Sequence, residues 1–329
     1  MKISVYSPLR ISFAGGGTDI SPFFENYTGA VVNTTIDRGI LIRYTDDCLP
    51  LELSSRDFLK SSIISSGKTS TEENIIHLFI KNGIKTGKLI INGDAPPGSG
   101  LGSSSSLING LLKIIHTIKK ENVNAYELAE ESYNLEKDDF NIILGKQDPY
   151  AISLGGFKFM KFFRNGVLSN KFESDNDFIL KLEKSILLVY TGKTRESSEA
   201  LREQSLRSSL NDEGTIKNLN LLKNLAYDLK SSVNKEDFSG LCDIINNGWK
   251  IKKSLGEKIS NEKIEHIMNY ARSKGATASR LLGGGSEGFV LLLSDPENID
   301  FLQKSMLSIS NFVIRVKFDP YGTRIISPF

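Results

Sequence analysis

The chain has 329 residues, of which 39% are hydrophobic and 24% charged, with 41 basic residues against 39 acidic ones. This length predicts about two domains with enough apolar surface for a core, and the ordinary proportions argue against long disorder. The formal net charge of +2 excludes the strongly basic signature of a nucleic-acid-binding protein, so any anion site must be local.

The positions of the cysteines and histidines and the lengths of the apolar runs exclude several further classes of protein. Cys48 and Cys242 lie far apart and form neither a zinc motif nor a disulfide framework, and the histidines are scattered. No apolar run approaches the roughly 18 residues of a membrane span. The opening segment MKISVYSPLR has no apolar signal-peptide region. We expect a cytoplasmic protein.

The first part of the chain reads as strands followed by a helix. Alternating or apolar residues predict short strands at 3–6, 11–13, 40–45 and 88–91. Pro8 is expected to interrupt the first two of them. Segment 93–102 holds too many glycines and prolines for regular structure. Apolar residues at helical spacing then predict a helix over 103–119.

After residue 119 the sequence predicts both helices and strands, and helices dominate from about residue 196. Asn124 is a good cap for a second helix, with Glu127 three residues on, and that helix should run to about Lys137. Further strands are predicted at 156–163, 186–190, 288–293 and 312–318. Helices are predicted over most of 196–270 and near 297–308.

This order predicts an α+β protein, because strands fill the first half and helices the second. We expect two intimately packed domains, residues 1–176 and residues 177–329. The boundary is placed in the polar stretch 173–177, which reads ESDND.

Residues 96–106 read PPGSGLGSSSS and stand at the start of the helix predicted over 103–119. Glycines let the backbone approach a phosphate closely with its N–H groups turned inward. The helix adds its free N–H groups and the positive end of its dipole. The segment therefore predicts an anion cradle. The alternative is a flexible loop that merely caps the helix.

Other phosphate-binding motifs do not fit. Segments 67–69 and 192–194 carry the last three letters of a Walker A motif, but Ser62 and Leu187 stand where its first glycine belongs. The glycine spacing in 98–102 is not the Rossmann fingerprint. The HRD and DFG segments of protein kinases are absent from the sequence.

PPGSGLGSSSS resembles the phosphate-binding motif of the GHMP kinases, the superfamily of galactokinase, homoserine kinase, mevalonate kinase and phosphomevalonate kinase. SPLRISFAGGGTDI, residues 7–20, resembles the N-terminal motif of that family, and LLGGGSEGFVLLL, residues 281–293, resembles its C-terminal glycine motif. The order and spacing fit across nearly the whole chain. The resemblance implies the GHMP kinase fold, with a strand-rich N-terminal domain that holds the glycine loop and a helix-rich, ferredoxin-like C-terminal domain.

Within the family, the chain is most similar to D-glycero-D-manno-heptose 7-phosphate kinases. The likeness lies in GGGTD at 15–19, GKQDPYAISLGGFKF at 145–159 and YTGKTRESS at 190–198. The third motif departs from the usual pattern at Gly284 and Glu287.

The resemblance implies transfer of the terminal phosphate of ATP, with Mg²⁺, to the anomeric hydroxyl of the heptose 7-phosphate. The product would serve the synthesis of nucleotide-activated heptose for a surface polysaccharide. ATP and the sugar phosphate would be the partners of a monomer or homodimer. The alternatives are another sugar 1-kinase, fucokinase- or galactokinase-like, or an inactive sensor that binds sugar and ATP on this fold.

The same resemblance assigns roles to individual residues. The expected ATP-binding residues are Pro97, Gly98, Ser99, Gly100, Leu101, Gly102, Ser103, Ser104 and Ser105. Ser104 and Glu136 match the magnesium ligands, with Asp138 and Asp139 as adjacent rivals of Glu136. Asp148 matches the catalytic base, and Arg10 matches the arginine that would hold it ionised. The alternatives are a helix-capping Asp148 and surface charges at Glu136 and Arg10.

Sugar-binding residues follow in the same way. Gly17, Thr18 and Asp19 match the segment that binds sugar hydroxyls, and a carboxylate suits a polyol because it can accept two hydroxyl hydrogen bonds. Asp37 is a weaker candidate that could equally belong to a turn. The substrate phosphate needs basic side chains, and the candidates are Lys193, Arg195, Lys250, Lys253 and Arg280, the last standing where a lysine is common. Gly284 is expected near the substrate, and Leu53, Ser54 and Ser55 near adenine by analogy.

Overall fold

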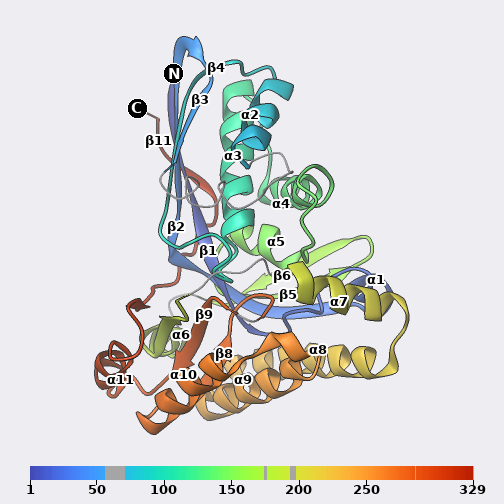
Figure 1. Ribbon diagram of the computed structural model, residues 1–329, viewed down its shortest axis with the longest axis vertical. Coiled ribbons are helices and arrows are strands. Elements are labelled where there is room, and N and C mark those ends of the chain that lie inside the picture. Colours follow the sequence, from blue (N-terminus) through green and yellow to red (C-terminus); the bar gives the residue numbers. More distant parts are fainter. Residues whose placement is uncertain (56–70, 174–175, 193–197, 286, 329) are drawn as a thin grey trace.

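The fold is described from a computed structural model, in which residues 1–55, 71–173, 176–192, 198–285 and 287–328 are placed. Two sheets, each with its own helices, make up the molecule (Figure 1). Long strands of the first sheet stand upright in that view, and the second sheet with its helices lies below them.

The first sheet has seven strands, with β11-β1-β2-β4-β3 as its main order and β5 and β6 attached through β2. Neighbouring strands are antiparallel except for the parallel pair β3 and β4. The strands are β1 (Lys2–Ala14), β2 (Gly29–Pro50), β3 (Glu52–Ser55), β4 (Thr86–Gly93), β5 (Lys158–Phe163), β6 (Gly166–Lys171) and β11 (Arg324–Pro328).

The strands predicted at 3–6 and 11–13 form one strand, β1, that continues through Pro8. The register of β1 against β2 shifts between Pro8 and Leu9. A proline, which has no N–H to give to the ladder, is tolerated at such an irregularity. The expected interruption is therefore a bulge within a strand, and it leaves the second half of β1 continuous up to the site described below.

Helices α2, α3 and α4 lie to one side of this sheet (Figure 1). The helices of the first half are α1 (Phe23–Tyr27), α2 (Thr71–Lys81), α3 (Ser103–Lys119), α4 (Ala125–Asn134) and α5 (Gln147–Leu154). The predicted bounds of α3 are confirmed, and so is the capping box of Asn124 and Glu127. The second helix was expected to reach Lys137, but a π-helical turn over Leu135–Asp139 follows its last α-helical residue, Asn134.

The second sheet has four strands in the order β10-β7-β9-β8. They are β7 (Ile186–Tyr190), β8 (Ala278–Leu281), β9 (Phe289–Leu293) and β10 (Val313–Ile314). Its helices are α6 (Asp177–Lys184), α7 (Ser198–Ser209), α8 (Glu213–Asn234), α9 (Phe238–Lys253), α10 (Glu262–Ser273) and α11 (Ile299–Met306). The strand predicted over 312–318 is reduced to β10 and a single bridge from Phe318 to Ile36.

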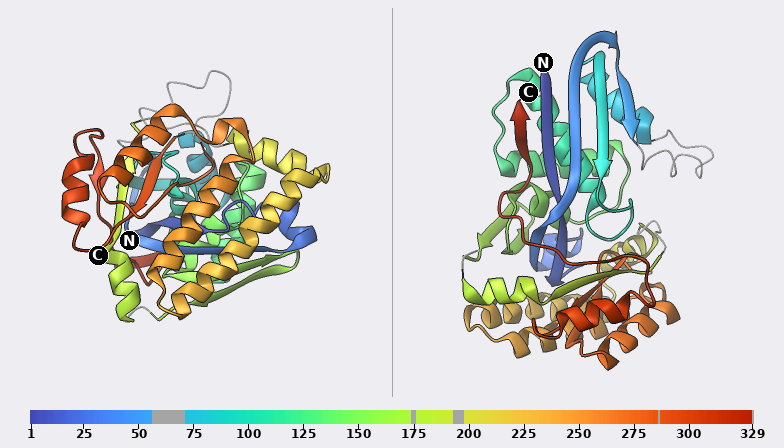
Figure 2. Two further views of the ribbon diagram at one scale, coloured as in Figure 1. Left: turned by 90° about the horizontal axis from the view of Figure 1, so that it is seen from below. Right: turned by 90° about the vertical axis from the view of Figure 1, so that its left-hand side faces the viewer.

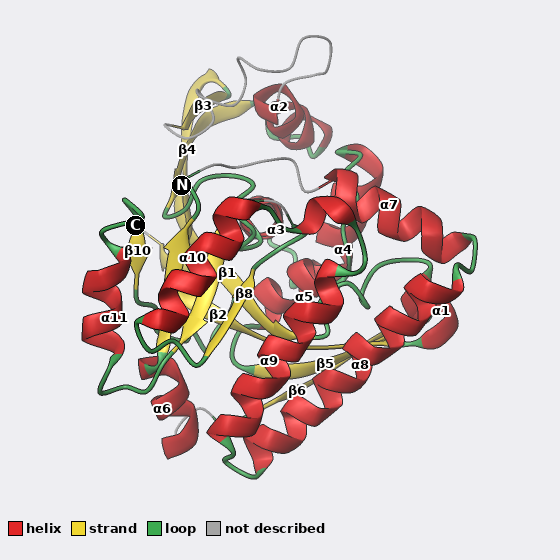
Figure 3. Cartoon of the chain, turned by 60° about the horizontal axis from the view of Figure 1, so that its bottom comes forward, coloured by secondary structure: helices red, strands yellow, loops and turns green. Residues whose placement is uncertain are grey.

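One buried cluster joins the two sheets. Phe13 and Val32 of the first sheet pack with Phe289 and Leu291 of the second, and α8 and α9, which run side by side (Figure 3), add Ala226 and other residues to the same core. Side chains from both halves of the chain are therefore packed together between the two sheets.

The chain returns to the first sheet at its far end. β11 pairs with β1, and Figure 2 shows the two labelled ends close together. The division at residue 176 stays a prediction, and β11 crosses it by joining the sheet of the first range. Among the described helices, none is both long and apolar enough to cross a membrane.

Candidate active site

The glycine loop and the third glycine segment touch each other directly. Gly98, Gly100 and Gly102 all have positive φ angles, of 72°, 81° and 78°. A Cβ atom on Gly100 would lie 2.5 Å from the carbonyl oxygen of Leu282, and one on Gly283 would lie 2.6 Å from the Cα of Gly100. Both positions require glycine because no side chain fits between the two backbones.

The loop leads into the N-terminus of α3. Gly102 stands at the cap position in the left-handed conformation and offers no side-chain cap, so the N–H groups of the first turn remain available for an anion. Pro97, Gly98 and Ser104 are exposed, whereas Ser99, Leu101 and Ser105 are buried. The loop therefore presents its glycine backbone and the α3 N-terminus, as the predicted anion cradle requires.

Arg10 and Asp148 form a bidentate ion pair beside this loop. Arg10 Nε donates to Asp148 Oδ1 at 2.7 Å and Nη2 donates to Oδ2 at 2.5 Å, while Nη1 donates to the carbonyl oxygen of Gly100. The Arg10 side chain is 6% exposed and that of Asp148 is 26% exposed. Asp148 lies in the first turn of α5. The buried guanidinium of Arg10 holds this partly exposed carboxylate in one orientation.

Glu136 is buried in the π-helical turn and faces the start of α3. Ser104 Oγ donates to Glu136 Oε2 at 2.9 Å. Burial raises the pKa of Glu136 to about 8, and the negative Asp148 adds to the rise, while hydrogen bonds from Ser105 and Ser104 oppose it. π-Helical turns of this kind often occur at functional sites.

The rival carboxylates lie elsewhere on the surface. Asp138 and Asp139 are both exposed, and Asp139 pairs with Lys81 at 3.3 Å. Among the described residues, no three His, Cys, Asp or Glu side chains gather into a metal cluster. A hydroxyl and a buried carboxylate are oxygen ligands of the kind that Mg²⁺ takes when phosphates and water complete its shell. Ser104 and Glu136 therefore fit the ion.

The turn after β1 places Asp19 beside the same site. Its carboxylate accepts hydrogen bonds from the backbone N–H groups of Gly17 at 3.0 Å and Gln147 at 3.1 Å. Burial raises the pKa of Asp19, and the neighbouring Asp148 raises it further. Thr18 is fully buried, and its hydroxyl contacts the backbone of Gly15 and Ala30, so it supports the turn.

Two residues that the sequence reading missed complete this region. Lys252 of α9 is buried, and its Nζ donates to the carbonyl oxygen of Gly16 at 3.3 Å. Gln204 of α7 is buried, and its Nε2 donates to the carbonyl oxygen of Gly17 at 2.8 Å. For Lys252 the sequence held a signal, because it shares the buried face of α9, whose members include Leu241, Ile245 and Trp249.

Arg280 of β8 reaches the turn at Gly16 and acts electrostatically on Lys252. Its Nη1 donates to the carbonyl oxygen of Phe13 at 2.6 Å, and its buried Nε has no hydrogen-bond partner among the described residues. Burial lowers the pKa of Arg280 to about 10, and Arg10 contributes to the shift. Burial likewise lowers the pKa of Lys252 to about 8, with Arg280 as the next cause.

Several predicted residues are not part of this cluster. Asp37 accepts a hydrogen bond from the backbone N–H of Lys317 and pairs with Arg38. Lys250 is exposed and Lys253 pairs with Glu265 at 3.0 Å. Gly284 is half-buried in the third glycine segment, and Leu53, Ser54 and Ser55 form β3 at the edge of the first sheet. Lys193 and Arg195 lie outside the described residues.

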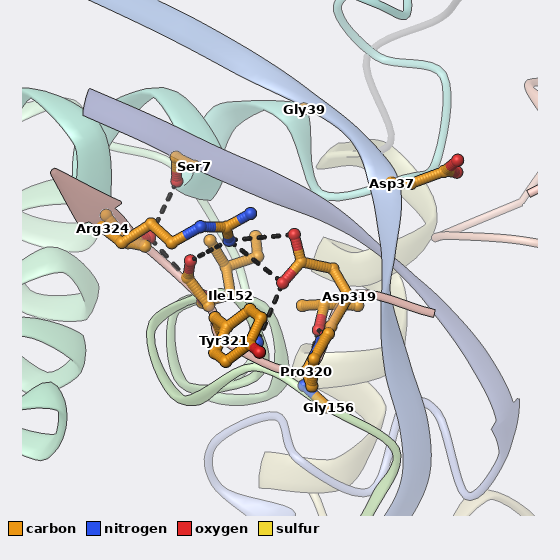
Figure 4. Close-up of polar contacts among 12 residues, drawn as sticks. Ser7, Asp37, Gly39, Ile152, Gly156, Asp319, Pro320, Tyr321 and Arg324 are labelled. Carbon is orange, nitrogen blue, oxygen red and sulfur yellow. Dashed lines mark hydrogen bonds and ion pairs between the residues drawn. The ribbon is translucent and has the colours of Figure 1, made fainter. Parts of the chain in front are cut away.

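Residues 319–324 contact the C-terminal end of α5, the helix that carries Asp148 (Figure 4). Thr323 donates its backbone N–H to the carbonyl oxygen of Ile152, and Gly156 donates to that of Asp319. Arg324 pairs with Asp319 at 2.9 Å, and Asp37 points away from this group in the same view. The segment fixes the C-terminal end of α5 and thereby the position of Asp148.

Comparisons with known proteins agree with this geometry. Residues 71–156 match the model of the GHMP kinases N terminal domain. The chain is 31% identical to the D-glycero-alpha-D-manno-heptose 7-phosphate kinase of Campylobacter jejuni over 98% of both chains.

Solved structures show the same fold. A crystal structure of a D-glycero-D-manno-heptose 1-phosphate kinase from Bacteroides thetaiotaomicron is similar with a TM-score of 0.78 and 24% identity over 99% of both chains. The Lactococcus lactis galactokinase complexed with galactose has a TM-score of 0.78 at 18% identity, over 98% of this chain and 95% of that one.

Proposed function

The chain belongs to the GHMP kinase family and is thus an ATP-dependent kinase, and we propose that it phosphorylates the anomeric hydroxyl of D-glycero-D-manno-heptose 7-phosphate. The observation that carries this choice of substrate is the full-length likeness to a kinase named for that sugar phosphate. The buried cations next to Asp19 support it, since a neutral sugar would give them no counter-charge.

The nucleotide phosphates would bind to the loop 97–105 and to the N-terminus of α3. Ser104 and Glu136 would hold Mg²⁺ against these phosphates, and the bound ion would neutralise the charge that develops on them during transfer. A buried carboxylate whose pKa is raised by burial gains most from a neighbouring cation, because the cation favours its charged form. In this arrangement the reacting phosphate would lie next to Asp148.

Asp148 would accept the proton of the anomeric hydroxyl as that oxygen attacks the terminal phosphate. Arg10 orients the carboxylate through two hydrogen bonds and also contacts Gly100 in the loop. The contact with Gly100 would keep Asp148 and the glycine loop in fixed positions relative to each other. Arg10 would also offset negative charge on the transferring phosphate.

The sugar would lie between Asp148 and the turn 15–19. Asp19 would accept hydrogen bonds from sugar hydroxyls, with Gly17 contributing backbone. Arg280 is the described candidate for the phosphate of the sugar, and Lys193 and Arg195 remain candidates outside the described residues. A heptose 1,7-bisphosphate would be the product, and it would feed the synthesis of nucleotide-activated heptose.

Product analysis tests this assignment. The enzyme with Mg²⁺ and ATP is offered heptose 7-phosphate, heptose 1-phosphate, unphosphorylated heptose, galactose and fucose, and the position of the new phosphate is read by ³¹P NMR. We expect turnover to be fastest with heptose 7-phosphate and the new phosphate to be on C1. Phosphate on another carbon, or a clear preference for galactose or fucose, would assign a different sugar kinase, and binding without turnover would mark a sensor.

A further inference from the structure

Polar side chains from four elements converge on Gly16 and Gly17. A Cβ atom on Gly16 would lie 3.4 Å from Ser12 Oγ and 3.8 Å from Arg280 Nη2, and one on Gly17 would lie 3.1 Å from Gln204 Oε1 and 3.3 Å from Lys252 Nζ. Glycine at position 17 therefore lets Gln204 and Lys252 pack directly against the backbone of the turn, and polar groups also lie at contact distance from Gly16. Such convergence of polar groups on a cradle without side chains is typical of a ligand site.

The charged side chains around Gly16 and Gly17 do not neutralise one another. Arg10 is neutralised by its bidentate pair with Asp148. Lys252 and Arg280 are both buried, and Asp19 is the carboxylate that acts on Lys252. Burial and Asp148 raise the pKa of Asp19. Asp19 acts on Lys252, whereas the charged neighbour that acts on Arg280 is Arg10. Positive charge therefore exceeds negative charge around these two buried cations, and a buried charge without compensation is costly.

We infer that Lys252, together with Arg280, forms a buried subsite that binds the anionic group of the sugar substrate, and that Lys252 makes the kinase prefer a phosphorylated sugar over a neutral one. This rests on the proposed function. Arg280 Nε has no hydrogen-bond partner among the described residues, so it can donate to a phosphate oxygen. The subsite lies beside Asp19, and Arg10, which also contacts Gly100 of the loop, is its neighbour on the side of the ATP phosphates.

The protonation of Lys252 supports the same assignment. The groups that face it are Arg280 of β8, Arg10 of β1 and Asp19 of the following turn, and burial and the arginines together lower its pKa to about 8. A bound phosphate would favour the charged form and raise this pKa. Binding of the sugar phosphate above pH 8 therefore requires proton uptake, and its KM should rise as pH increases beyond that value.

The test compares Lys252→Met, Lys252→Arg and the control Lys217→Met, an exposed lysine of α8. The measured quantity is the ratio of kcat/KM for heptose 7-phosphate to that for unphosphorylated heptose. We expect Lys252→Met to lower this ratio about 10- to 100-fold, because a charged hydrogen bond contributes about 1.5–3 kcal/mol. KM for ATP should stay unchanged, and the control should keep the wild-type ratio.

Folding and pH supply independent readouts. The thermal unfolding of Lys252→Met shows whether the variant is folded, so that a lower ratio can be assigned to the missing charge and not to lost structure. Lys252→Arg should retain the preference for the phosphorylated sugar and lose the rise of KM above pH 8, because arginine stays protonated.

The outcomes separate the two proposals. A wild-type enzyme that does not turn over heptose 7-phosphate contradicts the proposed function. Wild-type turnover of that substrate with an unchanged ratio in Lys252→Met contradicts the role of Lys252 alone. If Lys252→Met does not fold, a KM in Lys252→Arg that still rises above pH 8 overturns the inference.

Discussion

At the scale of single residues, the proposed chemistry depends on the orientation of Asp148. Asp148→Asn should lower kcat about 100-fold or more, because general-base assistance is worth 10²–10⁴-fold, and should leave KM for ATP nearly unchanged. Arg10 keeps its contact with Gly100 in this variant, so the loop should stay in place. Steady-state kinetics with saturating sugar measures both values. A kcat near that of wild type would remove Asp148 from the reaction.

The pair of Ser104 and Glu136 carries a second prediction at this scale. Glu136→Gln and Ser104→Ala should each raise the Mg²⁺ concentration for half-maximal rate, since each weakens or removes an oxygen ligand to a hard cation. Asp138→Asn is the matched control, because this carboxylate is two residues away but exposed. Measuring the rate at increasing Mg²⁺ concentrations gives this half-maximal concentration for each variant. If Asp138→Asn raised the Mg²⁺ concentration for half-maximal rate equally, the effect would come from the net charge of the protein and not from ligation by Glu136 or Ser104.

At the scale of elements, the glycine loop depends on its contact with the third glycine segment. Gly100→Ala would force a methyl group to within 2.5 Å of the Leu282 carbonyl oxygen, at a φ of +81°. We expect the loop to shift and KM for ATP to rise about tenfold or more, because misplaced phosphate-binding groups lose about 1.4 kcal/mol or more of binding.

Gly83→Ala is the control for backbone strain. Gly83 has nearly the same φ, +82°, and a Cβ there meets no described residue within 4 Å. It should lose about 1 kcal/mol of stability and keep the wild-type KM for ATP. Equal KM values in the two variants would show that the contact between the loops does not position the nucleotide.

At the scale of the whole molecule, the C-terminal segment joins the last strand to the helix that carries Asp148. Arg324 is 34% exposed in its side chain, but its partner Asp319 is 5% exposed. Arg324→Ala leaves that carboxylate buried without its cation, which should destabilise the fold by about 1–3 kcal/mol once the exposure of the arginine is discounted. Denaturant unfolding measures the change.

The exposed pair of Arg315 and Asp300 provides the comparison. Their side chains are 41% and 78% exposed. Arg315→Ala should therefore cost less than about 1 kcal/mol. Similar losses in both arginine variants would mean that the return of the chain to the first sheet does not depend on the buried pair.

The local parts of the site could be predicted from the sequence. The glycine loop at 96–106, the bounds of α3 and the capping box at Asn124 depend on neighbouring residues, so glycine, proline and cap propensities were sufficient. Resemblance to a known family then placed Arg10, Glu136 and Asp148, which the structure brings to the same loop. The expected break at Pro8 was wrong, because pairing with β2 overrides the local preference and absorbs the proline in a bulge.

Only the tertiary structure decided which cations enter the site. Lys250, Lys252 and Lys253 are chemically equal neighbours, and the packing of α9 buries Lys252 against Gly16 while leaving Lys250 exposed. Gln204 and Arg280 reach the same turn from α7 and β8. Contacts between residues so far apart in sequence depend on how helices and sheets pack, and no local propensity encodes that arrangement. The sequence by itself thus determined the glycine loop and the family, and the packing of the second sheet and its helices determined the charge next to Asp19.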